Sequence, residues 1–388
     1  MFTSWFSSLF GFEEGSYNET RGRFLLEPGA TPGSFMMLTR AQANSRRFDV
    51  GTFSCPTLAS LRAEARTLLE RLGPQGPTVL SHRAVGDIFT EHHRPENRGA
   101  VFQVASQFNA LEFAHAYAVP EEGVADYAND PTQGPACSLA CGAATVFRNY
   151  FATVDPSRPN EGQRRDSQLN NADLLSRALS NIDRANGGSG EPLFRVVNGY
   201  TQGSVEGLTR LSTILADVDR DELIGALKIS VHSRVGVDFA NRGWGVPPAP
   251  THVTQAFCSA VSCAYTRIET SHWAPLATMV LDGAYEATLL TAFVEKARGI
   301  GSGRVFLTLL GGGVFGNEDT WITASIARAV GIAEEMGLDV VLVHYRKISD
   351  DIVLAVGPVA APTVAVRDDI EPRVDRRTRR CHGWPCLP

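Results

Sequence analysis

Hydrophobic runs and helical repeats alternate along the C-terminal part of this chain, a pattern typical of α/β folds. Trp273–Ala297 is the longest helical pattern, with apolar residues at steps of three and four. Val305–Leu310 is dense in β-formers and predicts a strand that is buried on both faces. Trp321–Met336 again has helical spacing, and Val340–His344 is a further short strand. This order predicts an α/β domain around a central sheet.

The same two periods predict elements elsewhere in the chain. Strands are expected at Thr78–Leu80, Ala100–Asn109, Lys228–Phe239 and His252–Tyr265, and helices at Thr57–Leu72, Ala136–Phe151, Asp173–Ala185, Leu208–Leu215 and Asp221–Leu227.

These elements divide the chain into an extension, a core and a tail. We expect residues 1–76 to form an N-terminal extension with one helix and residues 77–360 to form the α/β domain. A polar, turn-rich stretch begins an insertion at about 156–225. Residues 361–388 are charged and then proline-bearing, so a disordered tail is predicted.

Three consecutive glycines follow the buried run, and they are the first candidate for chemistry. Gly311, Gly312 and Gly313 form a turn without Cβ atoms in which positive φ is available. A strand, a glycine loop and a helix together direct backbone N–H groups at a point where an anion can bind. The alternative is a tight turn whose glycines serve only the backbone geometry.

A second loop of the same type lies at Asn129–Tyr150. Asp130-Pro131 and Gly134-Pro135 are strong turn signals, and a helix follows them. The expected strand upstream ends in polar residues that include Gln107 and Asn109. Two glycine-bearing loops, each leading into a helix, are able to bracket a diphosphate from both sides.

Composition narrows the class of protein. The chain has 388 residues and a formal charge of −6, so nucleic acid is not expected as a general partner. Seven cysteines, an odd number, suit a reducing, cytoplasmic compartment. Cys381-His382 with Cys386 lacks a second ligand pair at zinc spacing, so no metal is expected. No apolar run approaches the length of a membrane span, and the N-terminal stretch lacks the basic region of a secretory signal.

The order of these motifs resembles the superfamily of macrodomains and poly(ADP-ribose) glycohydrolases. Ser106–Asn109 stands at the place of its asparagine loop and Gln133–Gly142 at that of its first glycine loop. Tyr285–Leu289 matches its late helix, and Gly311–Asn317 its second phosphate loop. The resemblance spans Ala100 to Tyr345. The strings Q-F-N-x-L-E and Y-E-A-T-L are also similar to a divergent, MavL-like subgroup that removes ADP-ribose from modified proteins, including ubiquitin.

The resemblance implies a macrodomain-like, three-layer α/β/α fold with a mixed central sheet. It also implies a site for ADP-ribose or an ADP-ribosylated protein, without a cofactor. In that site Asn109 would bond ribose hydroxyls, Phe315 would lie against the distal ribose, and Asn317 would close the loop or touch the ligand. The expected ligand-binding residues are Gln107, Asn109, Gln133, Gly134, Gly311, Gly312, Gly313, Val314, Phe315, Gly316 and Asn317.

Hydrolysis of an ADP-ribosyl bond needs carboxyl groups, because its transition state resembles an oxocarbenium ion. Asp282 and Glu286, one helical turn apart, are the first candidates; Glu112 is the next and Asp130 the last. Each also has a structural interpretation, as a solvated helix face, a cap or the start of a turn. Gln133–Gly142 lacks the paired glutamates of poly(ADP-ribose) glycohydrolases, which leaves that activity itself open.

Three functions therefore remain at the level of sequence. The first is an ADP-ribose-binding hydrolase that acts on modified protein. The second is a non-catalytic module that reads ADP-ribose or another nucleotide. The third is an interaction protein whose glycine loops are purely structural.

Overall fold

The computed structural model describes residues 4–40 and 45–356, and the predicted tail at 361–388 lies outside them. A mixed sheet runs through these residues in the order β1-β2-β3-β8-β9-β5-β10-β11-β4. Its strands are β1 Phe24–Pro28, β2 Phe35–Thr39, β3 Arg47–Ser54, β4 Val79–Val85, β5 Val101–Ala105, β8 Ser230–Gly236, β9 His252–Cys258, β10 Arg304–Leu307 and β11 Asp339–Tyr345.

One half of the sheet is parallel and the other antiparallel. The strands β9, β5, β10, β11 and β4 run in one direction, whereas β1, β2, β3 and β8 alternate. In the central pair, Val101 of β5 is opposite Thr254 of β9 and Ala105 is opposite Cys258. Both strands are buried over nearly their whole length, as expected for strands covered on two faces. Their carboxyl ends therefore meet at one edge of the sheet.

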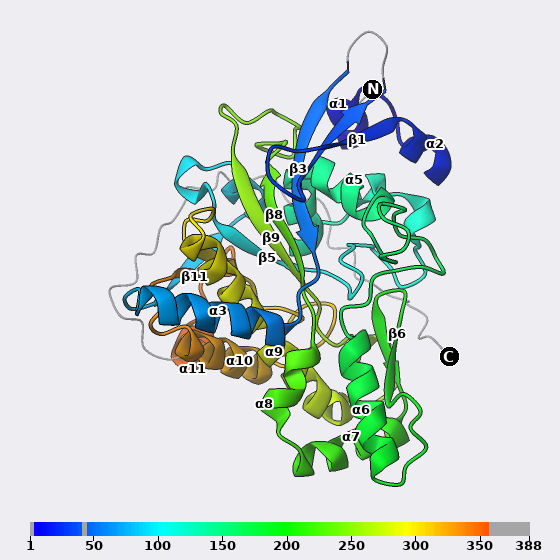
Figure 1. The fold of residues 1–388 in the computed structure, drawn as a ribbon, viewed down its shortest axis with the longest axis vertical. Helices are drawn as coiled ribbons and strands as arrows, with labels where there is room; N and C mark the ends of the chain where they lie inside the picture. The colour runs from blue at the N-terminus through cyan, green and yellow to red at the C-terminus, as the bar shows by residue number, and fades with distance from the viewer. Residues whose placement is uncertain (1–3, 41–44, 357–388) are drawn as a thin grey trace.

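Helices cover both faces of this sheet (Figure 1). The helices are α1 Trp5–Phe10, α2 Tyr17–Gly22, α3 Leu58–Leu72, α4 Gln133–Ala140, α5 Gly142–Tyr150, α6 Asp173–Ala185, α7 Val205–Asp217, α8 Arg220–Leu223, α9 Thr270–Ala297, α10 Asp319–Ile332 and α11 Asp350–Val356. One core lies under α3, α9, α10 and α11, and a second core lies under α1, α4 and α5. The predicted three-layer α/β/α fold with a mixed sheet is confirmed.

Two predicted elements are interrupted in the structure. The helix expected at Ala136–Phe151 is two helices, which meet at Cys141 with φ −119° and ψ 61°. At this break a Cβ on Gly142 would lie 2.8 Å from the Trp5 ring. The absence of a side chain at Gly142 therefore allows Trp5 of α1 to pack against the start of α5. The strand expected at His252–Tyr265 ends at Cys258, because the chain leaves the sheet edge there to form a loop and the short 3-10 helix η6, Cys263–Tyr265.

Residues before β4 contribute more than the single helix that the sequence predicted. The strands β1, β2 and β3 form the antiparallel end of the main sheet, and Thr52–Ser54 of β3 pair with β8. Rings of α1 cluster with the first of these strands, and the Phe10 and Phe24 centroids are 4.9 Å apart. This N-terminal part therefore shares the sheet and the core of the rest of the chain.

The stretch around 156–225 builds a separate lobe, green in the lower part of Figure 1. It contains α6, α7 and a two-stranded antiparallel hairpin, β6 Phe194–Val197 and β7 Tyr200–Gly203. The helix predicted at Asp173–Ala185 is confirmed with the same bounds. Tyr200, the first residue of β7, lines a cavity at the carboxyl edge of the parallel strands, so this lobe contacts that edge of the sheet.

Candidate functional site

A cavity of about 840 Å³ opens at the carboxyl edge of the parallel strands. Ala105 at the end of β5, Ala260 just after β9 and Thr308 just after β10 line its floor. Ligands of open α/β sheets commonly bind outside the carboxyl ends of the strands, where successive connections diverge. The two predicted glycine loops both reach this cavity, Gln133 and Gly134 from one side and Gly311 and Gly313 from the other.

The loop after β10 has the geometry of an anion site. Gly311 has φ 77°, and a Cβ there would lie 2.5 Å from Ala260 Cβ, so only glycine fits. Within the described part of the chain, the backbone N–H groups of Gly313, Val314 and Phe315 donate no hydrogen bond. Successive free N–H groups of this kind form a concave site for an oxyanion.

Asn317 and Tyr285 hold this loop in place from behind. Asn317 donates from its Nδ2 to the Val261 carbonyl at 2.8 Å, and its backbone N–H donates to Gly311 at 3.0 Å. The Tyr285 hydroxyl donates to the Thr308 carbonyl and accepts from the Leu310 N–H, at 2.8 and 2.9 Å. Of the two roles considered for Asn317, the structure gives it loop closure, and the Tyr-Glu-Ala-Thr-Leu string supplies a buried clamp.

On the opposite side, Gln133 ties the first loop to the sheet. Its Oε1 accepts from the Ala105 N–H at 2.9 Å, and its Nε2 donates to the Gln103 carbonyl at 2.8 Å. The next residue, Gly134, faces Glu112: a Cβ at Gly134 would lie 2.2 Å from Glu112 Oε2. The glycine thus leaves room for a carboxyl group at the start of α4.

Glu112 is a buried acid at the wall of the cavity, with 4% of its surface exposed. Burial raises its pKa well above the usual value, the charge of Asp130 raises it further, and Arg148 opposes both. Among the described residues, Glu112 Oε1 has no hydrogen-bond partner. Its own N–H donates to the Tyr127 hydroxyl at 2.7 Å, which fixes the backbone but leaves the carboxyl free. Burial therefore favours the protonated form of this carboxyl group.

Arg148 lies beneath this acid and was not a candidate from sequence. It is fully buried, its guanidinium is 3.8 Å from the centre of the Phe257 ring, and it donates to the Ala110 carbonyl at 3.1 Å and to Ser138 Oγ at 2.9 Å. Burial lowers its pKa to about 10, so it stays charged at neutral pH. Arg148 acts on Glu112 through its positive charge, which lowers the pKa of that carboxyl group.

Asp130 is the second carboxyl group that lines the cavity. It is half-buried, and its Oδ1 accepts from the Thr132 N–H at 2.8 Å, the geometry of an Asx turn. Asp130 therefore shapes the turn before α4 and also faces the ligand space. Its second oxygen remains available to a substrate.

The structure places the two leading catalytic candidates elsewhere. Asp282 pairs with Arg220 at 3.0 Å, and Glu286 pairs with Arg62 and, at 2.8 Å, with Arg328. Neither acid lines the cavity. The two share one side of α9, as their spacing predicted, but that side faces α3, α8 and α10 rather than the carboxyl edge. Of the four acids predicted as catalytic candidates, Glu112 and Asp130 line the cavity.

Four expected ligand residues also lie outside the lining of the cavity: Asn109, Gly312, Gly316 and Asn317. Asn109 is fully buried, with its Nδ2 donating to Gln168 Oε1 at 2.8 Å and its Oδ1 accepting from the Leu111 N–H at 3.0 Å. The Asn109 side chain is therefore engaged by Leu111 in its own loop and by Gln168 from a distant part of the chain, and it does not line the cavity. Gln107, Val314 and Phe315 do line the cavity.

Three aromatic rings close one wall of the cavity, and sequence reasoning identified only one of them. Tyr200, Tyr265 and Phe315 have ring centroids 5.1 to 5.7 Å apart. They come from the β6–β7 hairpin, from η6 and from the glycine loop, so nothing in their spacing along the chain links them. Such a cluster offers flat apolar surface to a sugar or a base.

Comparison with known proteins returns a result only at the level of structure. No protein-family model and no curated protein matches the chain. A mutant glycohydrolase from Deinococcus radiodurans, solved with ADP-ribose, matches at a TM-score of 0.42 and 11% identity, over 78% of this chain and 92% of that one. An enzyme from Thermomonospora curvata, bound to the inhibitor ADP-HPD, matches at 0.39 and 13%, over 78% and 83%. The similarity is to poly(ADP-ribose) glycohydrolases.

A further structure of the T. curvata enzyme matches at a TM-score of 0.40 and 14% identity, over 78% of this chain and 84% of that one. At such identity no side-chain role is transferred, so the roles of the cavity residues rest on their own geometry.

Two further searches concern metals and membranes. Within residues 4–40 and 45–356, no three His, Cys, Asp or Glu side chains are grouped to hold a metal ion. Among the helices in these ranges, none is both long and apolar enough to cross a membrane.

Proposed function

We propose that this protein binds ADP-ribose in the cavity and hydrolyses ADP-ribosyl linkages on modified protein. The observation that carries the proposal is the meeting, in one cavity, of free backbone N–H groups at Gly313–Phe315 with two carboxyl groups, Glu112 and Asp130. The volume of about 840 Å³ lies within the range of small-molecule sites.

Binding follows from the loop geometry. The diphosphate would accept hydrogen bonds from the N–H groups of Gly313, Val314 and Phe315, at a place where α10 begins a few residues later. The aromatic wall of Tyr200, Tyr265 and Phe315 would pack against the distal ribose, whose C1″ carries the modified group. Negative charge is met by backbone dipoles, which agrees with the absence of lysine and arginine from the cavity lining.

Hydrolysis follows from the different surroundings of the two acids. Glu112, protonated because it is buried, gives its proton to the leaving atom as the C1″ bond breaks. Asp130, half-buried, stabilises the oxocarbenium-like charge and accepts a proton from the water that adds to C1″. That proton returns to Glu112, and free ADP-ribose and the unmodified group leave. A pair of acids in unequal environments is the usual basis for dividing these tasks.

Binding is tested first by thermal unfolding. Free ADP-ribose should raise the Tm by binding the folded state, and AMP, which lacks the distal ribose, should raise it less. Equal responses to the two ligands would contradict a wall built for the distal ribose. No response to either would favour an interaction protein with structural glycines.

Turnover is tested by release of ADP-ribose from modified proteins with Arg-, Ser- and Glu-linked groups. Glu112→Gln and Asp130→Asn should each lower the rate by about a hundredfold or more, with ADP-ribose affinity changed only a few-fold. Asp282→Asn, an acid outside the cavity, is the matched control and should keep the wild-type rate. Wild-type protein that binds ADP-ribose yet releases none from any linkage would identify a reader module instead.

A further inference from the structure

A second cavity of about 310 Å³ lies at the opposite edge of the sheet. Its walls come from three places: the residues just before β5, the start of β9, and the loop between α9 and β10. The strand β5 has five residues, so about 16 Å of extended chain separates this edge from the first cavity. A ligand here is therefore distinct from one bound at the carboxyl edge.

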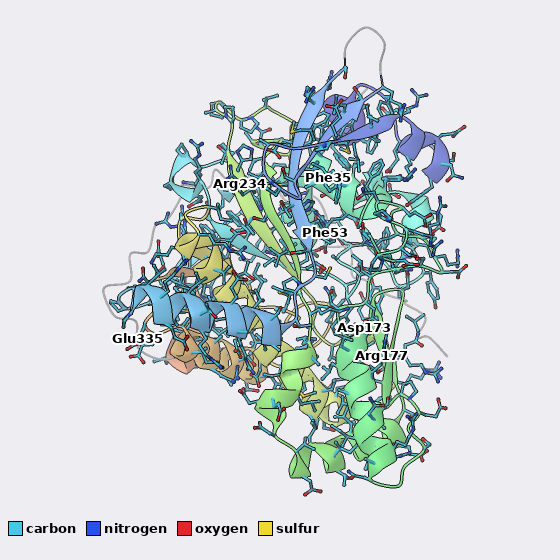
Figure 2. All side chains as sticks on the ribbon, in the orientation of Figure 1. Phe35, Phe53, Asp173, Arg177, Arg234 and Glu335 are labelled. Atoms are coloured by element: carbon cyan, nitrogen blue, oxygen red, sulfur yellow. The ribbon has the colours of Figure 1, made fainter. Side chains whose placement is uncertain are left out.

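Arg234 enters this cavity from an irregular position in β8. The register of β8 against β9 shifts between His232 and Val235, and Arg234 at the bulge has φ 55°. Non-glycine residues rarely adopt this left-handed conformation, and such strain is concentrated at functional sites. A bulge also redirects a side chain out of the regular alternation. In Figure 2, Arg234 lies in the upper half of the view, far from the labelled residues Asp173 and Arg177 of the green lobe.

The backbone is adapted to this bulge. Gly51 of β3 has φ 59°, and a Cβ there would lie 2.0 Å from the Ser233 carbonyl oxygen and 2.8 Å from that of Arg234. The Arg234 N–H donates to Thr254 Oγ1 at 3.2 Å. The unusual position of Arg234 is thus fixed by contacts with both neighbouring strands.

Arg98 and Arg234 bring two unpaired cationic groups to the cavity. Within the described residues, neither guanidinium forms a hydrogen bond or an ion pair, although Arg298 nearby pairs with Glu64, and Arg304 pairs with Asp339 at 2.7 Å. Arginine at such a place is suited to bidentate contacts with phosphate.

The nearby acids are already engaged by other groups. Asp49 Oδ2 lies 3.1 Å from His252 Nε2, and Asp49 Oδ1 accepts from the Gly51 N–H at 3.0 Å. Glu295 accepts from Ser233 Oγ and from Thr254 Oγ1, at 2.5 and 2.7 Å. Asp49 and Glu295 are close enough to Arg234 for its charge to lower their pKa values, but among the described residues neither forms an ion pair with it. The two exposed arginines therefore line the cavity without a directly bonded carboxylate.

We propose that this second cavity binds the phosphate group of a phosphate monoester, held between Arg98 and Arg234 with His252 at its base. Two guanidinium groups match the double charge of a monoester at neutral pH. The site is independent of ADP-ribose binding at the other edge, so its test and that of the proposed function can fail separately.

The test measures affinity for inorganic phosphate by calorimetry, with thermal shift as a second readout. Arg98→Gln and Arg234→Gly should each weaken phosphate binding by about tenfold or more, because each removes a charged bidentate contact. Arg234→Gly also relieves the positive φ, so the variant should unfold at the same or a higher temperature than wild type in the absence of phosphate. Loss of binding therefore cannot be attributed to loss of folding.

Arg346→Gly is the matched control, since Arg346 has φ 63° and lies on the surface with its guanidinium 4.8 Å from the Tyr345 ring centre. It should keep the wild-type response to phosphate, and Arg234→Gly should keep the wild-type response to ADP-ribose. The affinities of wild-type protein for ribose 5-phosphate and for a phosphoserine peptide are then compared. The ligand that binds more tightly shows whether the site prefers a free sugar phosphate or a phosphorylated side chain. Wild-type protein without measurable phosphate binding would overturn the proposal, as would equal affinity in wild type, Arg98→Gln and Arg234→Gly.

Discussion

Glu112 and Glu286 are both buried acids on the same molecule, and their surroundings differ in every other respect. Glu286, 1% exposed, is neutralised by hydrogen-bonded ion pairs with Arg62 and Arg328. Glu112, 4% exposed, lies beside a cavity, and one of its oxygens has no partner among the described residues. The first arrangement stabilises a junction of helices. The second favours the protonated form of a carboxyl group at the wall of a cavity. The number and spacing of acids thus say little about chemistry until their partners are known.

The largest expected difference is in stability. Glu286→Gln should lower the free energy of unfolding by about 2 kcal/mol, because it removes the charge that Arg62 and Arg328 share, and part of this loss is screened by solvent at the two arginines. Urea unfolding measures it, while the rate of ADP-ribose release should remain that of wild type. A large loss of rate in a folded variant would return Glu286 to the catalytic site.

The glycine loop offers a comparison of the same kind between two neighbours. Gly313→Val should weaken ADP-ribose binding by about tenfold, the equivalent of ~1.4 kcal/mol, with little change in Tm. Apart from its two chain neighbours, no described residue has an atom within 4 Å of a Cβ at Gly313, so the new side chain would extend into open space and not into the core.

Gly311→Val should show the opposite result, with a lower Tm, because positive φ and the contact with Ala260 make that position intolerant. Calorimetry and thermal unfolding on both variants check the pair. Equal affinity in Gly313→Val and wild type would remove the loop from the binding site.

The pH dependence of turnover sharpens the assignment of the acid. Burial raises the pKa of Glu112, and the proposed general acid is active only while protonated. The rate should therefore fall as pH rises through that raised pKa, by about tenfold per pH unit above it. The residual activity of Asp130→Asn should show the same fall in rate as the pH rises. A rate that stays constant from neutral to alkaline pH would contradict Glu112 as the proton donor.

The smallest effect is a gain in stability from Glu112→Gln. A folded-state pKa above 4.5 means that wild-type stability is fully present below about that pH and declines as pH rises towards the raised value. The neutral amide avoids this loss. The variant should match wild type near pH 4.5 and be more stable than wild type at neutral pH. Denaturant unfolding at both pH values measures the difference in the free energy of unfolding between the variant and wild type. A difference that is the same at both pH values would contradict a raised pKa for Glu112.

Periodicity was sufficient for much of the fold. The helix at Asp173–Ala185 was predicted because its apolar residues repeat at the helical period, and the strands β10 and β11 were predicted because they are short apolar runs rich in β-formers. The strands β1 and β2 were not predicted, since F-L-L-E-P and F-M-M-L-T lack polar alternation and lie at the edge of the sheet. Their assignment depends on pairing partners that are distant in the sequence.

For the site, glycine patterns were more informative than acids. Gly311 and Gly313 of the loop after β10, and Gly134 at the start of α4, all line the cavity. Asp282 and Glu286 show the expected helical spacing, but spacing does not state which neighbour a helix face meets. The sequence did not predict Tyr200 as a cavity residue, because the hairpin that carries it is distant in the sequence from the strands whose ends form the cavity.

The contact of Trp5 with Gly142 has a practical consequence for shortened forms of this protein. The α1 ring fills the break between α4 and α5, and its Nε1 donates to the Ala125 carbonyl at 2.9 Å. A truncation that begins at β1 would remove Phe6 and Phe10 with Trp5, and would uncover this hollow together with the ring of Phe24, which is buried against Phe6 and Phe10. Exposed aromatic patches of this kind promote self-association. Affinity tags and protease sites should therefore be placed before residue 4, never between α1 and β1.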